Sequence, residues 1–374
     1  MKILPERFKK NFFHNTMIYF IFGTVAELIK LFPVMKQFDR CHIGYKLVHT
    51  GQHAATMTQN IKRLHVQSPD FILTKRTENL KSISQMVLWI PSVLFHARTL
   101  PIKKSDYVIV HGDTMSTLLG LIIGKIFGAK ILHIESGKRT HNLMKPFPEE
   151  IIRIIVSRLS DFCFATDQHD ADNLAFRGNV FQTEGNTVVD SVREVLNYKP
   201  SPATRIYTRV SYILFLFGRQ ENILLKKNFD FIMDTLSLVL QKNVRVIWPI
   251  HAHTLHELHA KNYWGTVTKL QTQYQLEVAP PFDYVDFIFL LSHCLFVVTD
   301  GIGLQQEAYI LNKPTLVLRD TTETPGIGET GMLSYFQQAR VGMFLKTYSK
   351  LKRKKKIQTS PSKIIVDVVQ KHIL

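Results

Sequence analysis

The chain has 374 residues, a length that suits two domains of ordinary size better than one. Hydrophobic residues make up 45% of it and aromatic residues 11%, which supports a large core and excludes a wholly disordered protein. The net charge of +17 favours a polyanionic partner such as nucleic acid, an anionic membrane or a phosphorylated ligand.

About half of the excess charge lies near the C-terminus, where residues 346–374 contain nine Lys or Arg and one Asp. This basic tail is a candidate for weak peripheral contact with an anionic membrane, at about 1 kcal/mol per basic residue near the surface, although a solvated tail is the favoured interpretation. The basic run Lys352–Lys356 has no interleaved aromatic residues, and the chain has no nucleic-acid recognition motif. We therefore expect no nucleic-acid partner.

The three cysteines, Cys41, Cys163 and Cys294, are far apart and odd in number, so they indicate neither a disulfide framework nor a metal site. We expect them to be buried thiols in a reducing compartment. No stretch reaches the roughly 18 apolar residues of a membrane-spanning helix, and the N-terminal segment has no signal-peptide cleavage site. These features predict a cytoplasmic protein.

In the first half of the chain, short β-rich runs alternate with helical patterns. The predicted strands are Met17–Phe22, Tyr45–His49, Tyr107–His111, Lys130–Glu135 and Phe162–Thr166, and the predicted helices between them are Glu27–Phe38, Met57–Leu64 and Ser116–Phe127. This alternation is typical of a parallel sheet covered by helices on both faces.

The same alternation restarts after a linker-like stretch near Asn186–Pro202. The predicted strands of the second half are Tyr212–Phe217, Val244–Pro249, Leu276–Val278, Leu295–Thr299 and Thr315–Leu318. We therefore predict an α/β protein with two Rossmann-like domains, 1–190 and 191–345, whose parallel sheets face a central cleft. Residues 346–374 are predicted to form the basic tail and a C-terminal helix that packs back on the N-terminal domain.

Carboxylates follow the strands of the first half. Asp113 comes just after one predicted strand, Glu135 ends the next, and Glu149 lies in the segment Pro146–Glu150. Carboxylates gathered in a cleft are suited to acid/base chemistry. In the alternative interpretation, Asp113 and Glu149 cap helices and Glu135 pairs with Arg139, and the residues alone leave the two evenly balanced.

Two glycine turns lead from a strand into a helix and are candidates for binding an anion through backbone N–H groups. The first is Gly23-Thr24, where an ordinary cap by Thr24 is the favoured interpretation. The second is the turn Gly301–Gly303, where the alternative is a tight turn that needs glycine. Glu307 lies deeper in the second helix, where it would either accept ribose hydroxyls or be a solvated surface residue.

Ten stretches, in order, resemble the non-hydrolysing bacterial branch of the UDP-N-acetylglucosamine 2-epimerase family. They are GTVAELIKLFPV (Gly23–Val34), TGQH (Thr50–His53), VHGDTMST (Val110–Thr117), HIESGKRT (His133–Thr140), PFPEEIIR (Pro146–Arg153), EGNTVVDSV (Glu184–Val192), PIHAH (Pro249–His253), DYVDF (Asp283–Phe287), TDGIGLQQEA (Thr299–Ala308) and LNKPTLVLRDTTE (Leu311–Glu323). The ordered series covers most of the chain and is far more specific than any single piece.

The resemblance implies a GT-B-like fold with the UDP-sugar in the interdomain cleft, and usually a homodimer. It implies inversion at C2 of UDP-GlcNAc to give UDP-ManNAc for surface polysaccharide synthesis. The C2 proton is removed, UDP leaves by anti elimination to give a 2-acetamidoglucal, and UDP adds back after protonation from the other face. This chemistry needs carboxylates but no redox cofactor and no metal.

The resemblance also implies a role for individual residues. Asp113, Glu135 and Glu149 match the catalytic acids of the family. The matching substrate-binding residues are Lys30 facing the diphosphate, Arg153 at the arginine that follows the PEE motif, Phe287 stacked on uracil, Gly301, Ile302 and Gly303 in the diphosphate loop, and Glu307 on the ribose.

Four positions depart from the family's pattern, all on the phosphate side or at the histidine motif. Val25 and Thr324 replace arginines, Gly218 replaces a histidine and Ile302 replaces a serine. Because a charge-assisted hydrogen bond is worth roughly 1.5–3 kcal/mol, these losses need compensation.

Arg219, Lys138 and Arg139 are candidates for that compensation. The departures also leave other functions open. These are a GT-B-like glycosyltransferase, a nucleotide-sugar-binding paralogue without epimerase activity, and a non-catalytic regulator.

Overall fold

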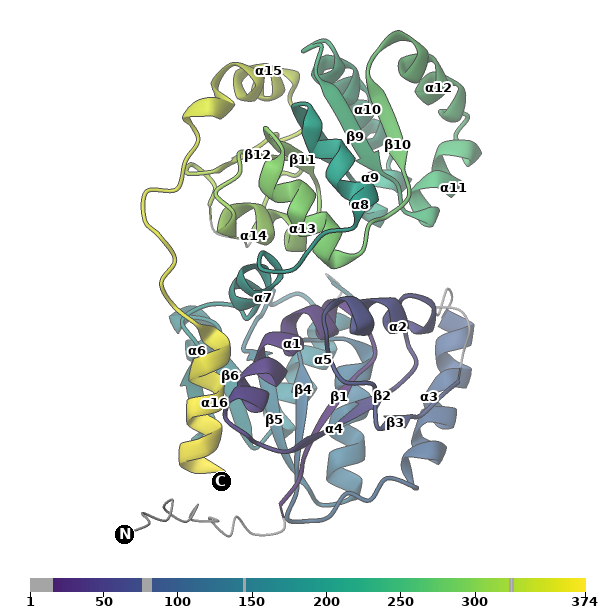
Figure 1. The fold of residues 1–374 in the computed structure, drawn as a ribbon. Coiled ribbons are helices and arrows are strands. Elements are labelled where there is room, and N and C mark those ends of the chain that lie inside the picture. Colours follow the sequence, from purple (N-terminus) through teal and green to yellow (C-terminus); the bar gives the residue numbers. More distant parts are fainter. Residues whose placement is uncertain (1–15, 76–82, 144–145, 323, 325) are drawn as a thin grey trace, which may run out of the picture. The chain divides into compact units, whose positions relative to one another are not determined.

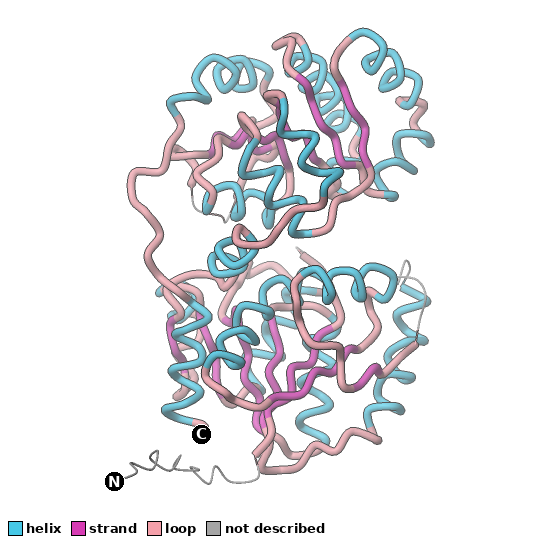
Figure 2. Tube along the Cα trace, in the orientation of Figure 1, coloured by secondary structure: helices cyan, strands magenta, loops and turns pink. Residues whose placement is uncertain are grey.

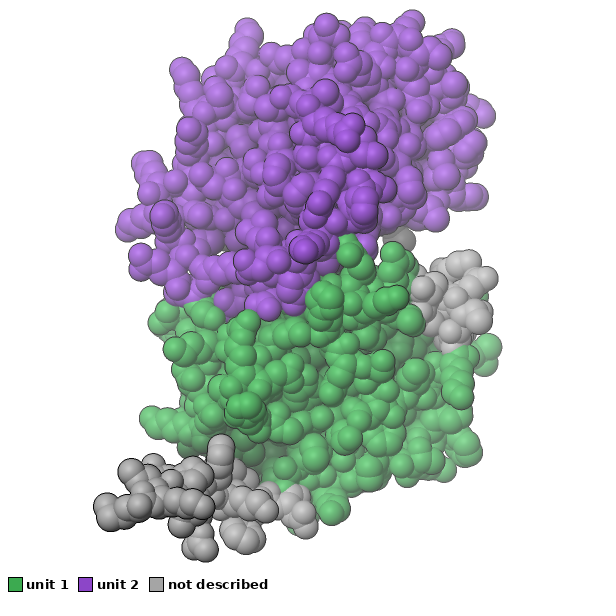
Figure 3. Space-filling view, viewed as in Figure 1, with its two compact units in different colours: residues 1–187, 360–374 green, residues 188–359 purple. Residues whose placement is uncertain are grey.

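The computed structural model describes residues 16–75, 83–143, 146–322, 324 and 326–374, so the N-terminal segment considered for targeting lies outside the described residues. The chain divides into two compact units (Figure 3). Unit 1 comprises the residues up to Thr187 together with Ser360–Leu374, and unit 2 comprises Val188–Thr359. The segment 346–374, predicted as one tail, is therefore shared between the units.

Unit 1 is built on a seven-stranded sheet with the order β3-β2-β1-β4-β5-β6-β7, in which neighbouring strands are parallel. The strands are β1 Ile18–Phe22, β2 Tyr45–His49, β3 Phe71–Ile72, β4 Tyr107–His111, β5 Lys130–Ser136, β6 Phe162–Ala165 and β7 Val180–Gln182. The helices are α1 Val25–Arg40, α2 Ala54–Arg63, α3 Ile83–Ala97, α4 Met115–Ile126, α5 Glu149–Leu159, α6 Gln168–Asp172 and α16 Pro361–His372. Helix α16 packs along α1 (Figure 1).

Unit 2 repeats the plan with a six-stranded parallel sheet in the order β10-β9-β8-β11-β12-β13. The strands are β8 Tyr212–Leu216, β9 Arg245–Pro249, β10 Leu276–Ala279, β11 Val297–Thr299, β12 Thr315–Val317 and β13 Gly331–Leu333. The α-helices are α7 Val188–Val195, α8 Pro202–Arg205, α9 Gln220–Leu224, α10 Lys226–Leu240, α11 Ala252–Ala260, α12 Trp264–Gln273, α13 Tyr284–His293, α14 Ile302–Ile310 and α15 Gln338–Thr347, and short 3-10 helices span Ile206–Arg209 and Tyr348–Lys350.

The central strands of each sheet are mostly apolar and buried, since helices cover the sheets (Figure 2). Every residue of β1 and β4 is buried, and in unit 2 Phe215 and Phe217 pack against the buried Trp248. Each such side chain contributes about 1.5–3 kcal/mol relative to an exposed one. The predicted α/β class with two Rossmann-like domains is confirmed.

The cysteines differ from the prediction in one case. Cys163 and Cys294 are buried, and burial raises their pKa values to about 11 and about 12, respectively. Cys41 is exposed, because it lies just after the last turn of α1, so the prediction of three buried thiols is wrong for this residue.

Candidate functional site

The carboxyl ends of β4 and β5 bring Asp113 and Glu135 to one edge of the unit 1 sheet. The two strands are neighbours, with His111 opposite Ile134 in the parallel register. Asp113 and Glu135 line one cavity of about 100 Å³. Three cationic side chains line the same cavity, namely Lys30, Lys138 and Arg153. Glu27 lines it as well, so the cavity combines three carboxylates with three positive groups.

Glu135 is held in an unusual backbone conformation. Its φ is 60°, in the left-handed region, and the pairing of β5 with β6 shifts register between Ile134 and Ser136. Such conformations cost of order 1–3 kcal/mol, and bulges of this kind re-aim a side chain. The carboxylate is thereby turned toward Lys30 and His111.

Two contacts stabilise the ionised form of Glu135. Its Oε2 lies 2.5 Å from Lys30 Nζ and 3.2 Å from Nε2 of the buried His111. Burial alone would raise the pKa of Glu135, but Lys30 and His111 outweigh that effect and hold it well below its usual range. The alternative pairing with Arg139 is not what the structure has. Glu135 is thus a carboxylate at neutral pH and can accept a proton.

Asp113 is positioned by the turn after β4 and by α5. Gly112, with a φ of 67°, makes the turn, and its carbonyl accepts a hydrogen bond from His133 Nε2 at 2.7 Å. Burial lowers the pKa of His133 to about 4, so this ring is a neutral donor. Arg153 Nε donates to Asp113 Oδ2 at 2.7 Å. Asp113 caps no helix, since Thr114 caps α4.

Glu150 anchors the loop that precedes α5. The buried carboxylate accepts hydrogen bonds from Arg139 Nε at 2.6 Å and from the backbone N–H groups of Thr140 and His141. Arg153 Nη1 lies 3.5 Å from the same carboxylate. Burial would raise the pKa of Glu150, but Arg139 and the N–H donors lower it overall. The positive charge of Arg139 is therefore paired with the carboxylate of Glu150.

Glu149, the third predicted acid, is the first residue of α5 and follows the cis Phe147–Pro148 peptide. It is not among the residues that line the 100 Å³ cavity. Its Oε2 is buried and has no hydrogen-bond partner among the described residues. Of the three predicted acids, the cavity therefore brings together Asp113 and Glu135 but not Glu149.

The Gly23-Thr24 turn is closed by Glu27, which the sequence did not single out. Glu27 Oε2 accepts from the N–H groups of Gly23 and Thr24 at 3.0 and 2.8 Å, and from the Thr24 hydroxyl. Its Oε1 accepts from the hydroxyls of Thr114 and Thr117. Thr24 caps α1, as the favoured interpretation had it, and the N–H groups of this turn face a protein carboxylate.

In unit 2, the predicted diphosphate loop forms the first turn of α14. Gly301 is the N-cap residue and gives no side-chain cap, and Ile302 and Gly303 begin the helix. Gly301 has an extended backbone with φ −82°, so the turn does not depend on a left-handed glycine. Among the described residues, an added Cβ would meet no atom within 4 Å at Gly303.

Glu307 lies in the same helix as this turn, and Phe287 lies in α13, which contacts that helix. Glu307 is 9% exposed, so the alternative of a solvated surface residue is wrong. It lies beside the buried Tyr284 of α13. Burial and the Glu307 carboxylate together raise the pKa of the Tyr284 hydroxyl well above its usual value. Phe287, one turn further along α13, is half-buried.

A buried carboxylate ties the end of β11 to the segment that departs from the family's histidine motif. Asp300 is 2% exposed and accepts from the N–H groups of Gly218 and Arg219 and from Asn222 Nδ2. Burial raises the pKa of Asp300, and these donors partly offset the rise. The backbone at Gly218 is thus fixed although it carries no side chain.

The two lost arginines fall in different units. Val25 is the first residue of α1 and is half-buried, whereas Thr324 is 6% exposed in the loop after β12. Neither side chain can supply a positive charge.

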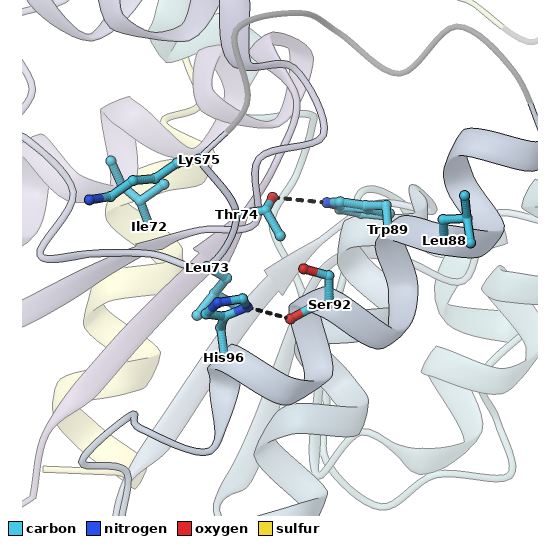
Figure 4. Close-up of a pocket in the computed structure, with 8 residues that line it drawn as sticks. All are labelled: Ile72, Leu73, Thr74, Lys75, Leu88, Trp89, Ser92 and His96. Carbon is cyan, nitrogen blue, oxygen red and sulfur yellow. Dashed lines mark hydrogen bonds between the residues drawn. The ribbon is translucent and has the colours of Figure 1, made fainter.

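A larger cavity of about 660 Å³ lies elsewhere in unit 1, between the end of β3 and α3 (Figure 4). Trp89 Nε1 donates to the Thr74 hydroxyl there, and His96 Nδ1 contacts the Ser92 carbonyl. The residues that line it include no carboxylate. It therefore lacks the acid/base groups that the smaller cavity has.

Comparison with known proteins identifies the family. The sequence profile of a family described as UDP-N-acetylglucosamine 2-epimerase matches residues 36–363. The chain belongs to this family. The resemblance stated from the sequence is therefore confirmed.

Individual relatives of the epimerase family agree over nearly the whole chain. A UDP-N-acetylglucosamine 2-epimerase of Methanococcus maripaludis is 30% identical over 82% of this chain and 83% of its own, and one of Salmonella borreze is 31% identical over 84% of each. The crystal structure of the Neisseria meningitidis UDP-GlcNAc 2-epimerase bound to UDP-GlcNAc superposes with a TM-score of 0.79, at 26% identity, over 96% of this chain and 100% of that one.

The described residues contain no group of three or more His, Cys, Asp or Glu side chains arranged to hold a metal ion. No helix within the described ranges is long and apolar enough to cross a membrane.

Proposed function

We propose that this member of the epimerase family interconverts UDP-GlcNAc and UDP-ManNAc. The observation that carries the proposal is the unit 1 cavity, where Asp113 and Glu135 lie with Lys30, Lys138 and Arg153. Removing the C2 proton needs a base that is ionised at neutral pH, and expelling UDP needs nearby positive charge. The cavity supplies both, and UDP-N-acetylhexosamines are the substrates with that pair of demands.

The contacts of the carboxylates suggest their roles. Glu135, ionised by Lys30 and His111, accepts the C2 proton. Glu149, the third acid that matches the family, is assigned delivery of the proton to the opposite face. Asp113, paired with Arg153, orients the sugar. In unit 2, the Gly301–Gly303 turn, Glu307 and Phe287 bind the diphosphate, ribose and uracil, respectively.

We further propose that the protein acts as a homodimer in the cytoplasm and supplies surface polysaccharide synthesis. The family resemblance supports the dimer and the pathway, and the free thiols suit a reducing compartment. Four lysines of the run Lys352–Lys356 are exposed, and Arg353 holds the run on the carbonyls of Tyr309 and Ile310. This run is the candidate for weak peripheral membrane contact, and no nucleic-acid partner is proposed.

The test is to incubate the purified protein with UDP-GlcNAc in D₂O and follow the sugar by NMR. We expect deuterium at C2 and the appearance of UDP-ManNAc. If both signals are absent at high enzyme concentration, the proposal is wrong.

A second function, glycosyl transfer by a diverged paralogue, is favoured by the losses at Val25, Gly218 and Thr324. In the same incubation with a sugar acceptor, it predicts UDP release and sugar transfer without exchange at C2.

A further inference from the structure

Lys138 is the cation of the unit 1 cavity with the loosest contacts to carboxylates. Lys30 Nζ lies 2.5 Å from Glu135 and Arg153 Nε lies 2.7 Å from Asp113. Lys138 Nζ lies 3.3 Å from Asp170 Oδ2 and 3.4 Å from the Thr166 hydroxyl. A tight charge-assisted hydrogen bond is about 2.7–2.9 Å long. The Lys138 ammonium therefore keeps the most capacity to contact an incoming anion.

The backbone fixes the position from which Lys138 reaches into the cavity. Gly137, with a φ of 89°, turns the chain so closely against α6 that an added Cβ would lie 2.1 Å from the Asp170 carbonyl oxygen. Asp170 is 4% exposed, and its carboxylate also accepts a hydrogen bond from the Thr166 hydroxyl. Lys138 therefore follows a closely packed turn, and its ammonium group contacts the buried carboxylate of Asp170.

Lys138 also stays charged. Its side chain is 27% exposed, and burial by itself would lower its pKa. The carboxylates of Glu135 and Asp170 outweigh this effect, so the pKa of Lys138 is raised above its ordinary value. Loss of the proton from this ammonium at neutral pH is thus excluded.

The reaction places a negative charge within reach of this cavity. When Glu135 takes the C2 proton, the C2–H electron pair forms the C1=C2 bond, the C1–O bond breaks, and its electron pair goes to the β-phosphate oxygen. That oxygen and C2 are both bonded to C1. A cation that shares a cavity of about 100 Å³ with Glu135 therefore lies close to the leaving group.

We propose that Lys138 binds the diphosphate and stabilises the departing UDP, in place of the positive charge lost at Val25 of the same unit. The inference rests on the proposed function. Of the other two candidates for compensation, Arg139 is bound to Glu150 and does not line this cavity, and Arg219 belongs to unit 2. Lys138 remains protonated throughout and exchanges no proton.

The test compares binding of UDP with binding of UMP, which lacks the β-phosphate, by isothermal titration calorimetry. Lys138→Met keeps the unbranched stem of the side chain, one atom shorter, and removes its charge. We expect its Kd for UDP to rise about 10- to 100-fold, the equivalent of one charge-assisted hydrogen bond, and its Kd for UMP to stay unchanged. Lys138→Arg should bind UDP more tightly than Lys138→Met.

The matched control is Lys125→Met, which removes another cation of unit 1. Lys125 lies in the last turn of α4, forms an ion pair with Asp161 and does not line the cavity. It should bind both nucleotides like the wild type.

Three outcomes would overturn the inference. They are wild-type affinity of Lys138→Met for UDP, an equal loss of affinity for UDP and UMP, and no UDP binding by the wild type. The D₂O exchange of the wild type reports on the epimerase proposal separately. If UDP binding depends on Lys138 while the wild type exchanges no deuterium, the epimerase proposal fails, and with it the role of Lys138 in UDP departure, and only the contact of Lys138 with the diphosphate stands.

Discussion

Helices α1 and α14 begin in the same way in the two units but differ in what their first N–H groups contact. Each follows a central parallel strand and a glycine turn. At α1, Thr24 caps the helix and the carboxylate of Glu27 accepts the N–H groups of Gly23 and Thr24. At α14, Gly301 provides no side-chain cap. Two similar glycine turns are thus followed by different helix N-termini: side chains cap α1, and no side chain of the cap residue caps α14.

The difference predicts that different helix ends serve the chemistry and the binding of the nucleotide. A phosphate at α1 would have to displace a buried carboxylate that already neutralises the helix end, whereas α14 offers its N–H groups and its dipole to a ligand. Unit 1 instead presents the charged cavity around Glu135 at the neighbouring strand ends. We expect proton transfer to depend on unit 1 and diphosphate binding to depend on α14, assisted by Lys138.

Glu135→Gln should produce the largest effect. The amide keeps the shape of the side chain but cannot accept the C2 proton, so C2 exchange in D₂O should fall about 10²- to 10⁴-fold. UDP binding, measured by calorimetry, should persist. Exchange at the wild-type rate would show that another group is the base. Loss of UDP binding would show that Glu135 of unit 1 also contributes to nucleotide binding.

Glu27→Gln tests whether the N-terminus of α1 is structural. The amide nitrogen cannot accept the hydrogen bonds that the second carboxylate oxygen now accepts, so buried donors lose their partner. We expect the free energy of unfolding to fall by about 1–3 kcal/mol, measured in urea, with UDP affinity unchanged. A stable variant that no longer binds UDP would reverse the comparison and make α1 the phosphate site.

The sequence predicted the sheets well because a buried parallel strand is a local pattern. Tyr45–His49 and Tyr107–His111 match β2 and β4 residue for residue, and the meeting of Asp113 with Glu135 follows from the parallel register. Helix α3 was not predicted. Its apolar residues show no single face, since Val87 and Leu88 are exposed, and Pro91 lies within it.

The rest of the site could not be predicted because it depends on partners far apart in the chain. Glu27 is held by Thr114 and Thr117, and His111 becomes part of the site only through the bulge at Glu135. Glu307 is a buried acid because Tyr284 of another helix covers it. No spacing along the sequence records these contacts, although carboxylates at successive strand ends did mark the region.

Gly301→Asp would give α14 the kind of acidic cap that closes α1. The extended backbone at Gly301 accepts a side chain, and an added Cβ makes only ordinary contacts there. The new carboxylate should stabilise the helix by a few tenths of a kcal/mol and repel the diphosphate, so UDP affinity should fall about tenfold. Gly301→Asn, which caps without charge, should lose less affinity. Equal binding by both variants would mean that the diphosphate does not rest on α14.

Gly218→His should have the smallest effect. It tests whether the loss of the family's histidine at this position lowers activity. The family resemblance places a histidine at this position, and among the described residues an added Cβ would meet only Thr254 Oγ1, at 3.5 Å. The backbone N–H already bonds to Asp300 and would not move. We expect kcat for C2 exchange to rise severalfold, with Gly218→Phe as the control of similar bulk. A rise in both variants would reflect packing, and no rise in either would mean that the cations of unit 1 already compensate for the lost histidine.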